Sequence, residues 1–173
     1  MAATWTDDGR TVEALGHVEY QGHRHPRRCP AMRYLPGWRN AVIALRSSDS
    51  GRRFERAAPD PAVAALPYPY ASTLGAPSGY FSPSNVVALD DGRRAVFVFA
   101  EAAGRQRRGP CLLVTRDTAD PAAWRAPRVG DEREDRLDDK HGGGCVPVHG
   151  PGGTVTSIVR HRATGLWVAL VAG

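Results

Sequence analysis

The chain has 173 residues, of which 42% are apolar and 24% are charged, a composition that suits one folded domain and excludes a mostly disordered protein. Its net charge of +5 does not indicate a nucleic-acid partner, because Lys140 is the only lysine and the arginines are scattered as on a solvated surface. No apolar run is long enough for a membrane span, so we expect no membrane partner. No signal peptide is visible; the compartment therefore stays unknown, and is cytoplasmic if the N-terminus is genuine.

The first half of the chain is predicted to form short strands separated by tight turns. A turn is expected at residues 7–9, which read Asp-Asp-Gly, and two strands are expected within residues 12–34. Further strands are expected at 40–46 and 53–56, since Asn, Asp and Gly bound these runs. The Ala-rich segment 60–66 is predicted to be a short helix that the following proline closes.

The second half repeats this pattern with apolar runs that carry β-branched and aromatic residues. Each run is short and is bounded by Gly, Pro, Asp or Asn, which is typical of strands and the turns between them. The predicted strands cover residues 85–89, 94–100, 111–116, 124–128, 155–159 and 166–171.

Two pairs of segments match each other, which indicates an internal repeat. Residues 85–100 and 155–172 both read as strand, turn and strand, and residues 40–49 align with residues 108–117. Four-stranded repeats are typical of β-propeller blades, so we predict an all-β fold, a partial β-propeller of about two and a half four-stranded antiparallel blades. The turn at 7–9 is assigned to a still earlier blade.

The whole chain, residues 1–173, is expected to form a single propeller fragment with blade boundaries near 60–80 and 130–145. A propeller closes with about four to eight blades. We therefore expect that the chain is incomplete or that a second copy is needed to supply the missing blades.

One turn carries a recognisable motif. Residues 47–54 read Ser-Ser-Asp-Ser-Gly-Arg-Arg-Phe, in which Asp49 can accept hydrogen bonds from backbone N–H groups and Gly51 permits a positive φ. The turn around Asp117 is a longer, degenerate version. The motif resembles the Asp-box of sialidases and related propeller proteins, which implies that these residues are structural and lie away from the active site.

A broader resemblance covers most of the chain. Residues 79–87, 109–117 and 120–125 look like segments of the five-bladed propeller glycosidases, the group of glycoside hydrolase family 43 and sialidase-like proteins. The resemblance implies a carbohydrate ligand at one end of the propeller axis and no cofactor. It also implies a glycoside hydrolase or a degenerate relative that uses paired carboxylates on a glycosidic bond.

Two glutamates are the candidate catalytic groups. Glu19 lies two residues from His17, so both side chains share one face of an extended segment, where Glu19 could serve as a general acid. Glu101 follows an apolar strand and is expected to be partly desolvated. The structural alternatives are a solvated Glu19 and a Glu101 that pairs with Arg105 or Arg108.

Other ligand contacts are expected around the same end of the propeller. Besides His17, the predicted substrate-binding residues are His23, Arg24, His25, Asn85 and His141. Aromatic rings in the Gly- and Pro-rich segments could stack on sugars, namely Tyr20, Trp38, Tyr68, Tyr70, Tyr80 and Phe81. Asn85 stands where the family 43 pattern would hold an Asp, which favours the alternative function of a non-catalytic carbohydrate- or protein-binding propeller.

The histidines and cysteines raise two further questions, about a metal and about a disulfide. His23 and His25 alternate onto one face, but no His or Cys spacing matches a known zinc pattern, so no metal site is predicted. Cys111 lies in an apolar run and is expected to be a small core residue. The three cysteines do not form a disulfide framework, although they leave one bridge open.

Overall fold

The computed structural model describes residues 1–6, 8–27, 29, 34–35, 37–67, 76–128, 134–137, 144–150 and 152–173. Within these residues every regular element is a β-strand, apart from the single 3₁₀ turns η1 (Gly22–Arg24) and η2 (Pro121–Ala123). The predicted all-β class is therefore confirmed. The described strands form one mixed sheet of nine strands and two separate two-stranded sheets, without closing into a ring.

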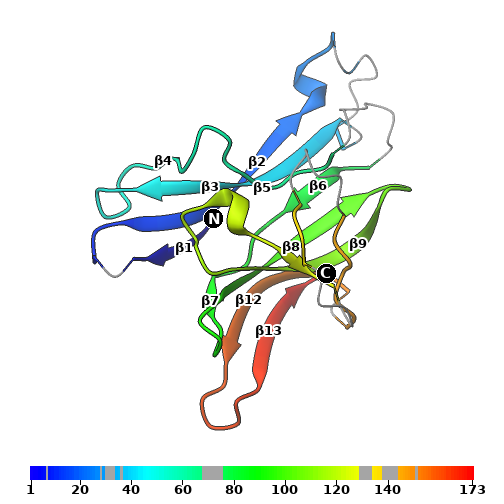
Figure 1. Cartoon of the computed structure of the whole chain (residues 1–173). Coiled ribbons are helices and arrows are strands. Elements are labelled where there is room, and N and C mark those ends of the chain that lie inside the picture. The colour runs from blue at the N-terminus through cyan, green and yellow to red at the C-terminus, as the bar shows by residue number, and fades with distance from the viewer. Residues whose placement is uncertain are drawn as a thin grey trace.

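The first half of the chain forms a four-stranded antiparallel meander (Figure 1), whose two central strands pair along their whole lengths. The strands are β1 (Ala2–Trp5), β2 (Val12–Gln21), β3 (Trp38–Ser47) and β4 (Glu55–Arg56). Every second residue in the middle of β3 is buried, as expected for a strand with one face toward the core.

The turn between β1 and β2 is held by Asp8. Its carboxylate accepts hydrogen bonds from the backbone N–H groups of Arg10 and Thr11, at 2.8 and 2.7 Å. The prediction assigned this turn to a blade earlier than the one with β3. That assignment is wrong, because β1 pairs with β2 and β2 pairs with β3 in one meander.

The predicted helix at residues 60–66 is also wrong. The segment contains β5 (Ala62–Ala64), which pairs with β3. Prolines bound the segment closely on both sides, and so short a stretch cannot repay the cost of helix nucleation. The extended backbone instead buries Val63 and Leu66, which are at most 4% exposed, in the core.

The second half of the nine-stranded sheet is built around two long strands that pair antiparallel, β8 and β9. Its strands are β6 (Ser78–Phe81), β7 (Val87–Ala88), β8 (Arg94–Ala102) and β9 (Gln106–Thr115). β7 pairs with β8 on the side away from β9, and Arg125 bridges Val114 on the far side of β9. The order of β7, β8 and β9 is the one that the sequence predicted for the first three strands of the segment 85–128, whereas the predicted fourth strand at 124–128 adds to β9 only the bridge at Arg125. Beyond Arg125, β10 (Ala126–Pro127) pairs with β11 (Glu134–Asp135).

β6 joins the two meanders. It pairs antiparallel with the end of β8 and in parallel with the start of β3, where Gly79 faces Asn40. Gly79 has a φ of +128°, and a Cβ at this position would lie 2.0 Å from the carbonyl oxygen of Asn40. Only glycine permits so close an approach of two backbones, so Gly79 fixes the junction of the meanders.

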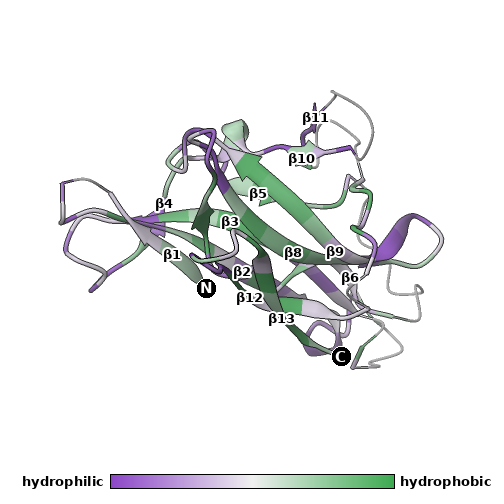
Figure 2. Ribbon diagram, turned by 90° about the horizontal axis from the view of Figure 1, so that it is seen from below, coloured by the Kyte–Doolittle hydropathy of each residue, from purple (hydrophilic) through white to green (hydrophobic). Residues whose placement is uncertain are grey.

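The hydrophobic core is shared by both meanders. Leu15 and Val42 come from the first meander and Val96, Val98 and Leu113 from the second, and all five are at most 2% exposed. Figure 2 shows the hydrophobic stretch along β8 and β9. Because the core needs side chains from both meanders, these described parts of the chain form one folded unit.

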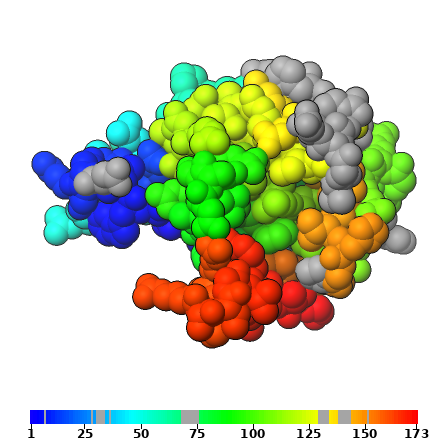
Figure 3. All heavy atoms as spheres, turned by 60° about the horizontal axis from the view of Figure 1, so that its bottom comes forward, coloured from blue at the N-terminus to red at the C-terminus, as the bar shows by residue number. Residues whose placement is uncertain are grey.

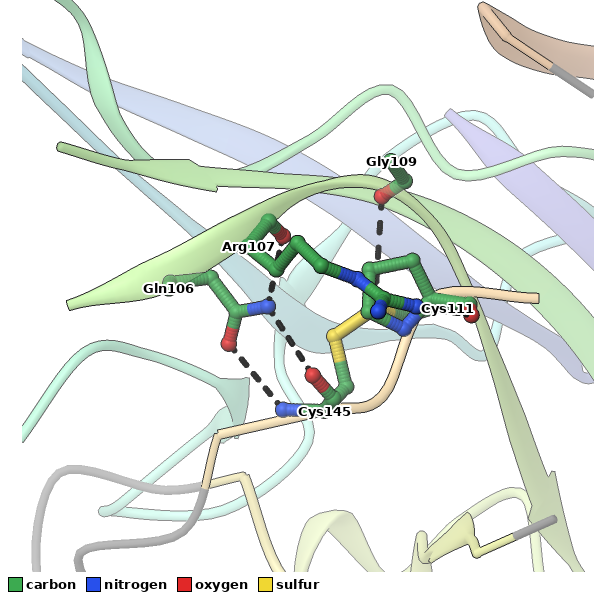
Figure 4. Close-up of a disulfide and its surroundings, with 6 residues drawn as sticks. Gln106, Arg107, Gly109, Cys111 and Cys145 are labelled. Atoms are coloured by element: carbon green, nitrogen blue, oxygen red, sulfur yellow. Dashed lines mark hydrogen bonds between the residues drawn. A yellow bond between two sulfur atoms is a disulfide. The ribbon is translucent and has the colours of Figure 1, made fainter. Parts of the chain in front are cut away.

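A disulfide between Cys111 and Cys145 fastens the segment at 144–148 to β9 (Figure 4). The side-chain amide of Gln106 supports it, donating to the Cys145 carbonyl oxygen at 2.9 Å and accepting from the Cys145 N–H at 3.1 Å. Cys111 does lie in the core, but it is bonded and not a lone small residue. Cys29 is a buried free thiol.

The C-terminal hairpin is formed by β12 (Thr154–Arg160) and β13 (Trp167–Ala172), close to the predicted strands. It projects from the body of the molecule, in orange and red in Figure 3. All residues of β13 are exposed, Leu170 by 66%. An apolar cavity of about 220 Å³ lies between the hairpin and the second meander, lined by Phe97, Ile158 and Trp167 among others.

Candidate functional site

Glu19 lies near the end of β2, between two polar neighbours. His17 Nδ1 is 3.7 Å from one carboxylate oxygen, and Gln21 Nε2 donates a 3.0 Å hydrogen bond to the other. The spacing of two residues places all three side chains on one face of the strand, as the sequence predicted for His17 and Glu19. The side chains of Glu19 and His17 are 33% and 19% exposed, so a ligand can reach them.

Glu101 lies near the end of β8 and is paired with a cation. Arg108 Nε is 3.6 Å from the Glu101 carboxylate, and the same guanidinium covers the Phe99 ring at 5.4 Å from its centroid. Pairing with Arg108 is one of the alternatives that the sequence raised. The Glu101 side chain is 27% exposed and that of Arg108 is 68% exposed, so both can also contact a ligand.

The register of the sheet connects the two glutamates. Glu19 faces Asn40 across β2 and β3, Asn40 faces Gly79, and Gly79 faces Glu101. The glutamates are therefore three strand spacings apart, which is about 14 Å between Cα atoms in a flat sheet. Their carboxylates would have to lean toward each other to reach the separations of about 5–9.5 Å that glycosidases use.

Aromatic rings bridge the space between the two glutamates. The ring of His17 contacts Phe81 with centroids 5.7 Å apart, and Phe81 contacts Phe99 at 6.4 Å, both edge to face. Phe99 in turn lies under Arg108, so contacts run without interruption from His17 to Arg108. We call this set the carboxylate–aromatic surface; it consists of His17, Glu19, Asn40, Phe81, Phe99, Glu101 and Arg108.

Asn40 is the residue of this surface that the fold itself does not explain. It is 1% exposed, yet neither its Nδ2 nor its Oδ1 has a hydrogen-bond partner among the described residues. His17 Nε2 is buried in the same unpartnered state. Leaving a buried amide without partners costs about 1–3 kcal/mol for each unsatisfied group. Neighbouring groups cover these atoms, so a hydrogen-bonding molecule would recover that free energy only if it displaced the groups that cover them.

The predicted residues after β2 extend the polar surface beyond the end of that strand. His25 stacks on Tyr20 with ring centroids 4.9 Å apart, and His23 contacts Tyr34 at the same distance. Arg24 is exposed. These residues lie on or next to η1, which follows Glu19 and Gln21 directly along the chain.

Asn85 lies outside this surface and contacts the C-terminal hairpin. Its Nδ2 donates to the carbonyl oxygen of Ile158 at 2.9 Å and its Oδ1 accepts from the Ile158 N–H at 2.8 Å. We call these two hydrogen bonds the Asn85 clamp. An ion pair between Arg160 and Asp90 lies beside them. The amide of Asn85 is therefore occupied by backbone. The predicted residues His141, Tyr68 and Tyr70 lie outside the described part of the chain, and Tyr80 is buried in the core.

The predicted turn residues hold backbone groups. Ser47 Oγ donates to Asp49 Oδ1 at 2.8 Å, and the Arg53 N–H donates to the same oxygen at 2.9 Å. These bonds, that of Arg53 first, lower the pKa of Asp49. Gly51 has a φ of +84°. Asp117 likewise accepts a 2.9 Å hydrogen bond from a backbone N–H two residues later.

The described residues contain no helix that is long and apolar enough to cross a membrane. In the same part of the chain, no three His, Cys, Asp or Glu side chains come together as a metal ion would require. Comparison with family models, with curated proteins and with solved structures finds no match for this chain.

Proposed function

We propose that this chain is part of a β-propeller that binds a glycan on the carboxylate–aromatic surface. The observation that carries the proposal is Asn40, whose buried amide has no partner among the described residues although it lies in the register row between the two glutamates. A sugar hydroxyl both donates and accepts hydrogen bonds, and so can satisfy both the Nδ2 and the Oδ1 of such an amide.

The order of the strands supports the propeller. β1 to β4 form one four-stranded antiparallel meander, β7, β8 and β9 form a three-stranded one to which Arg125 adds a single bridge, and the hairpin of β12 and β13 follows. Successive four-stranded units along the chain are what propeller blades require.

The neighbours of Asn40 suit a sugar in chemistry as well. The Glu19 and Glu101 carboxylates accept hydrogen bonds from hydroxyl groups, and Arg108 and His17 Nε2 offer further polar contacts. Phe81 is partly exposed and presents an aromatic ring between them. Aromatic and aliphatic contacts with a few well-placed polar groups are typical of small-molecule sites.

Hydrolysis of the glycan is the second candidate function, and the His17–Glu19 pair favours it. A carboxyl group beside a histidine can protonate a glycosidic oxygen, which gives Glu19 the role of general acid and Glu101 that of the second carboxylate. The wide register spacing of the glutamates and the ion pair of Glu101 with Arg108 favour binding over hydrolysis.

The test is calorimetric titration with gluco-, galacto-, manno-, xylo- and arabino-oligosaccharides in both anomeric linkages. We expect at least one to bind saturably, and Phe81→Ala and Glu101→Gln each to weaken it by about tenfold, as lost stacking or a lost charged hydrogen bond would. Glu134→Gln is the matched control, because Glu134 is also an exposed glutamate paired with an arginine, Arg93. Binding that no variant weakens, or no binding in the whole panel, would rule the proposal out.

An aryl-glycoside panel separates the two candidate functions. Turnover that Glu19→Gln abolishes would establish hydrolysis. Glycan binding without turnover would establish the non-catalytic function.

A further inference from the structure

A second polar site lies at the opposite end of β3 from Asn40. It is a groove of about 380 Å³ around the turn between β3 and β4. Arg46 from the end of β3, Arg53 from the turn and Arg56 from β4 line it, together with Asp49 and Glu55. We call it the arginine groove. Its volume falls in the range of about 300–1,000 Å³ that is usual for small-molecule sites.

The three arginine side chains of the arginine groove are exposed, and their guanidinium groups have no ion-pair or hydrogen-bond partner among the described residues. Among the described residues, none of the three lies within 4.0 Å of a carboxylate, whereas Arg93, Arg108 and Arg160 elsewhere in the structure all form ion pairs. No described side chain or backbone oxygen accepts a hydrogen bond from them either.

The two acids of the groove leave positive charge in excess. The groove is lined by three arginines but only two acidic residues, and one Asp49 oxygen already accepts hydrogen bonds from Ser47 Oγ and the Arg53 N–H. Glu55 faces Arg46 across the strand pair without reaching ion-pair distance. Arg52, next to the groove, adds a further positive charge that acts on Asp49.

We propose that the arginine groove binds a tetrahedral oxyanion, the phosphate or sulfate group of a small ester. Guanidinium groups present planar forks of N–H donors that match the oxygens of such anions, and several forks around one concave site hold an anion more firmly than a single exposed cation does. The site is separate from the carboxylate–aromatic surface, since Arg46 lies six residue steps along the extended strand from Asn40, which is about 20 Å.

The experiment is calorimetric titration of the whole chain with glucose 6-phosphate and, separately, glucose 6-sulfate, against sodium chloride of equal ionic strength. We expect saturable binding of at least one ester. Arg53→Gln and Arg56→Gln are each expected to weaken it by about tenfold, as the loss of a charged hydrogen bond does. A preference for one ester identifies whether phosphate or sulfate is the natural group.

Arg162→Gln is the matched control, because it removes the same charge from the exposed turn between β12 and β13. Unchanged binding in this variant, with the losses above, supports the proposal. An equal loss in all three variants would mean that only net charge attracts the anion, and it would overturn the proposal. Absence of saturable binding of both esters to the wild type would overturn it as well. Either outcome is independent of the glycan titrations, which use uncharged sugars.

Discussion

Removal of the Cys111–Cys145 disulfide is expected to destabilise the whole fold. The bridge closes a loop across a sequence separation of 34 residues, from the core strand β9 to the segment after the second meander. Loop-closure entropy for a loop of this length corresponds to about 4 kcal/mol at 25 °C. For a chain of this size, the same free energy corresponds to a fall in Tm of about 8–16 °C.

The assay is urea unfolding of the wild type and of the double variant Cys111→Ala/Cys145→Ala, with and without reductant. We expect the free energy of unfolding of the double variant to be lower by about 4 kcal/mol without reductant and to be insensitive to reductant. The wild type should lose a similar amount when it is reduced.

Cys29→Ala is the matched control, because Cys29 is a buried cysteine outside the bridge. This variant should respond to reductant as the wild type does. The reasoning would be refuted if reductant changed the wild type by less than about 1 kcal/mol, a value well below the usual contribution of a disulfide.

Three other substitutions test the described contacts. Asn85→Ala removes both hydrogen bonds to Ile158. At about 1 kcal/mol per bond, their loss should make hydrogen exchange at the Ile158 amide about 30-fold faster, and unchanged exchange would mean that the Asn85 clamp does not hold the hairpin. Hydrogen bonds from Thr11 lower the pKa of Asp8, so the folded carboxylate stabilises the protein above its unfolded pKa of about 3.9, and this stability is lost as the pH falls through the folded pKa. The difference in urea stability between wild type and Asp8→Asn should therefore be largest near pH 7 and should narrow below about pH 4, and a difference independent of pH would contradict this. Gly79→Ala should cost about 3 kcal/mol or more in thermal unfolding, whereas Gly104→Ala, at another positive φ but with open space around it, should cost only the backbone strain of about 1–2 kcal/mol; equal losses would show that the contact with Asn40 is unimportant.

The strands were predictable where local pattern and tertiary environment agree. The run at 94–100 is short, apolar and rich in β-branched and aromatic residues, all of which favour a strand, and it forms most of β8. The predicted strand began at residue 111, because a proline such as Pro110 usually marks a strand boundary. In the structure β9 begins at Gln106 and includes Pro110. The helix predicted at 60–66 was wrong because local composition and tertiary environment disagree there. The Ala-rich composition favours a helix, whereas pairing with β3 and burial in the core favour a strand.

The candidate site was predictable only in part, because its members meet through long-range pairing. His17 and Glu19 are two residues apart, so their contact follows from strand geometry. The contacts that connect them to Glu101 run through Phe81 and Phe99, and no local pattern encodes the parallel pairing of β3 with β6. The available signal for Asn40 was a polar residue at the start of an apolar run.

The disulfide and the clamp of Asn85 were beyond sequence reasoning for the same physical reason. Three cysteines allow three pairings, and only the fold brings Cys111 and Cys145 to a Cα separation of 6.0 Å. Asn85 was predicted as a ligand contact from its place in the propeller pattern. Its amide instead meets the backbone of Ile158, which is 73 residues away in the sequence.

Mapping of backbone amide shifts during titration with the tightest-binding oligosaccharide tests the glycan site most directly. We predict saturable changes at His17 and Glu19 on β2, at Asn40 on β3 and at Glu101 on β8, three strands that the sheet register brings together. Changes confined to the hairpin of β12 and β13, or none at Asn40 at saturation, would contradict the assignment of this surface to glycan binding.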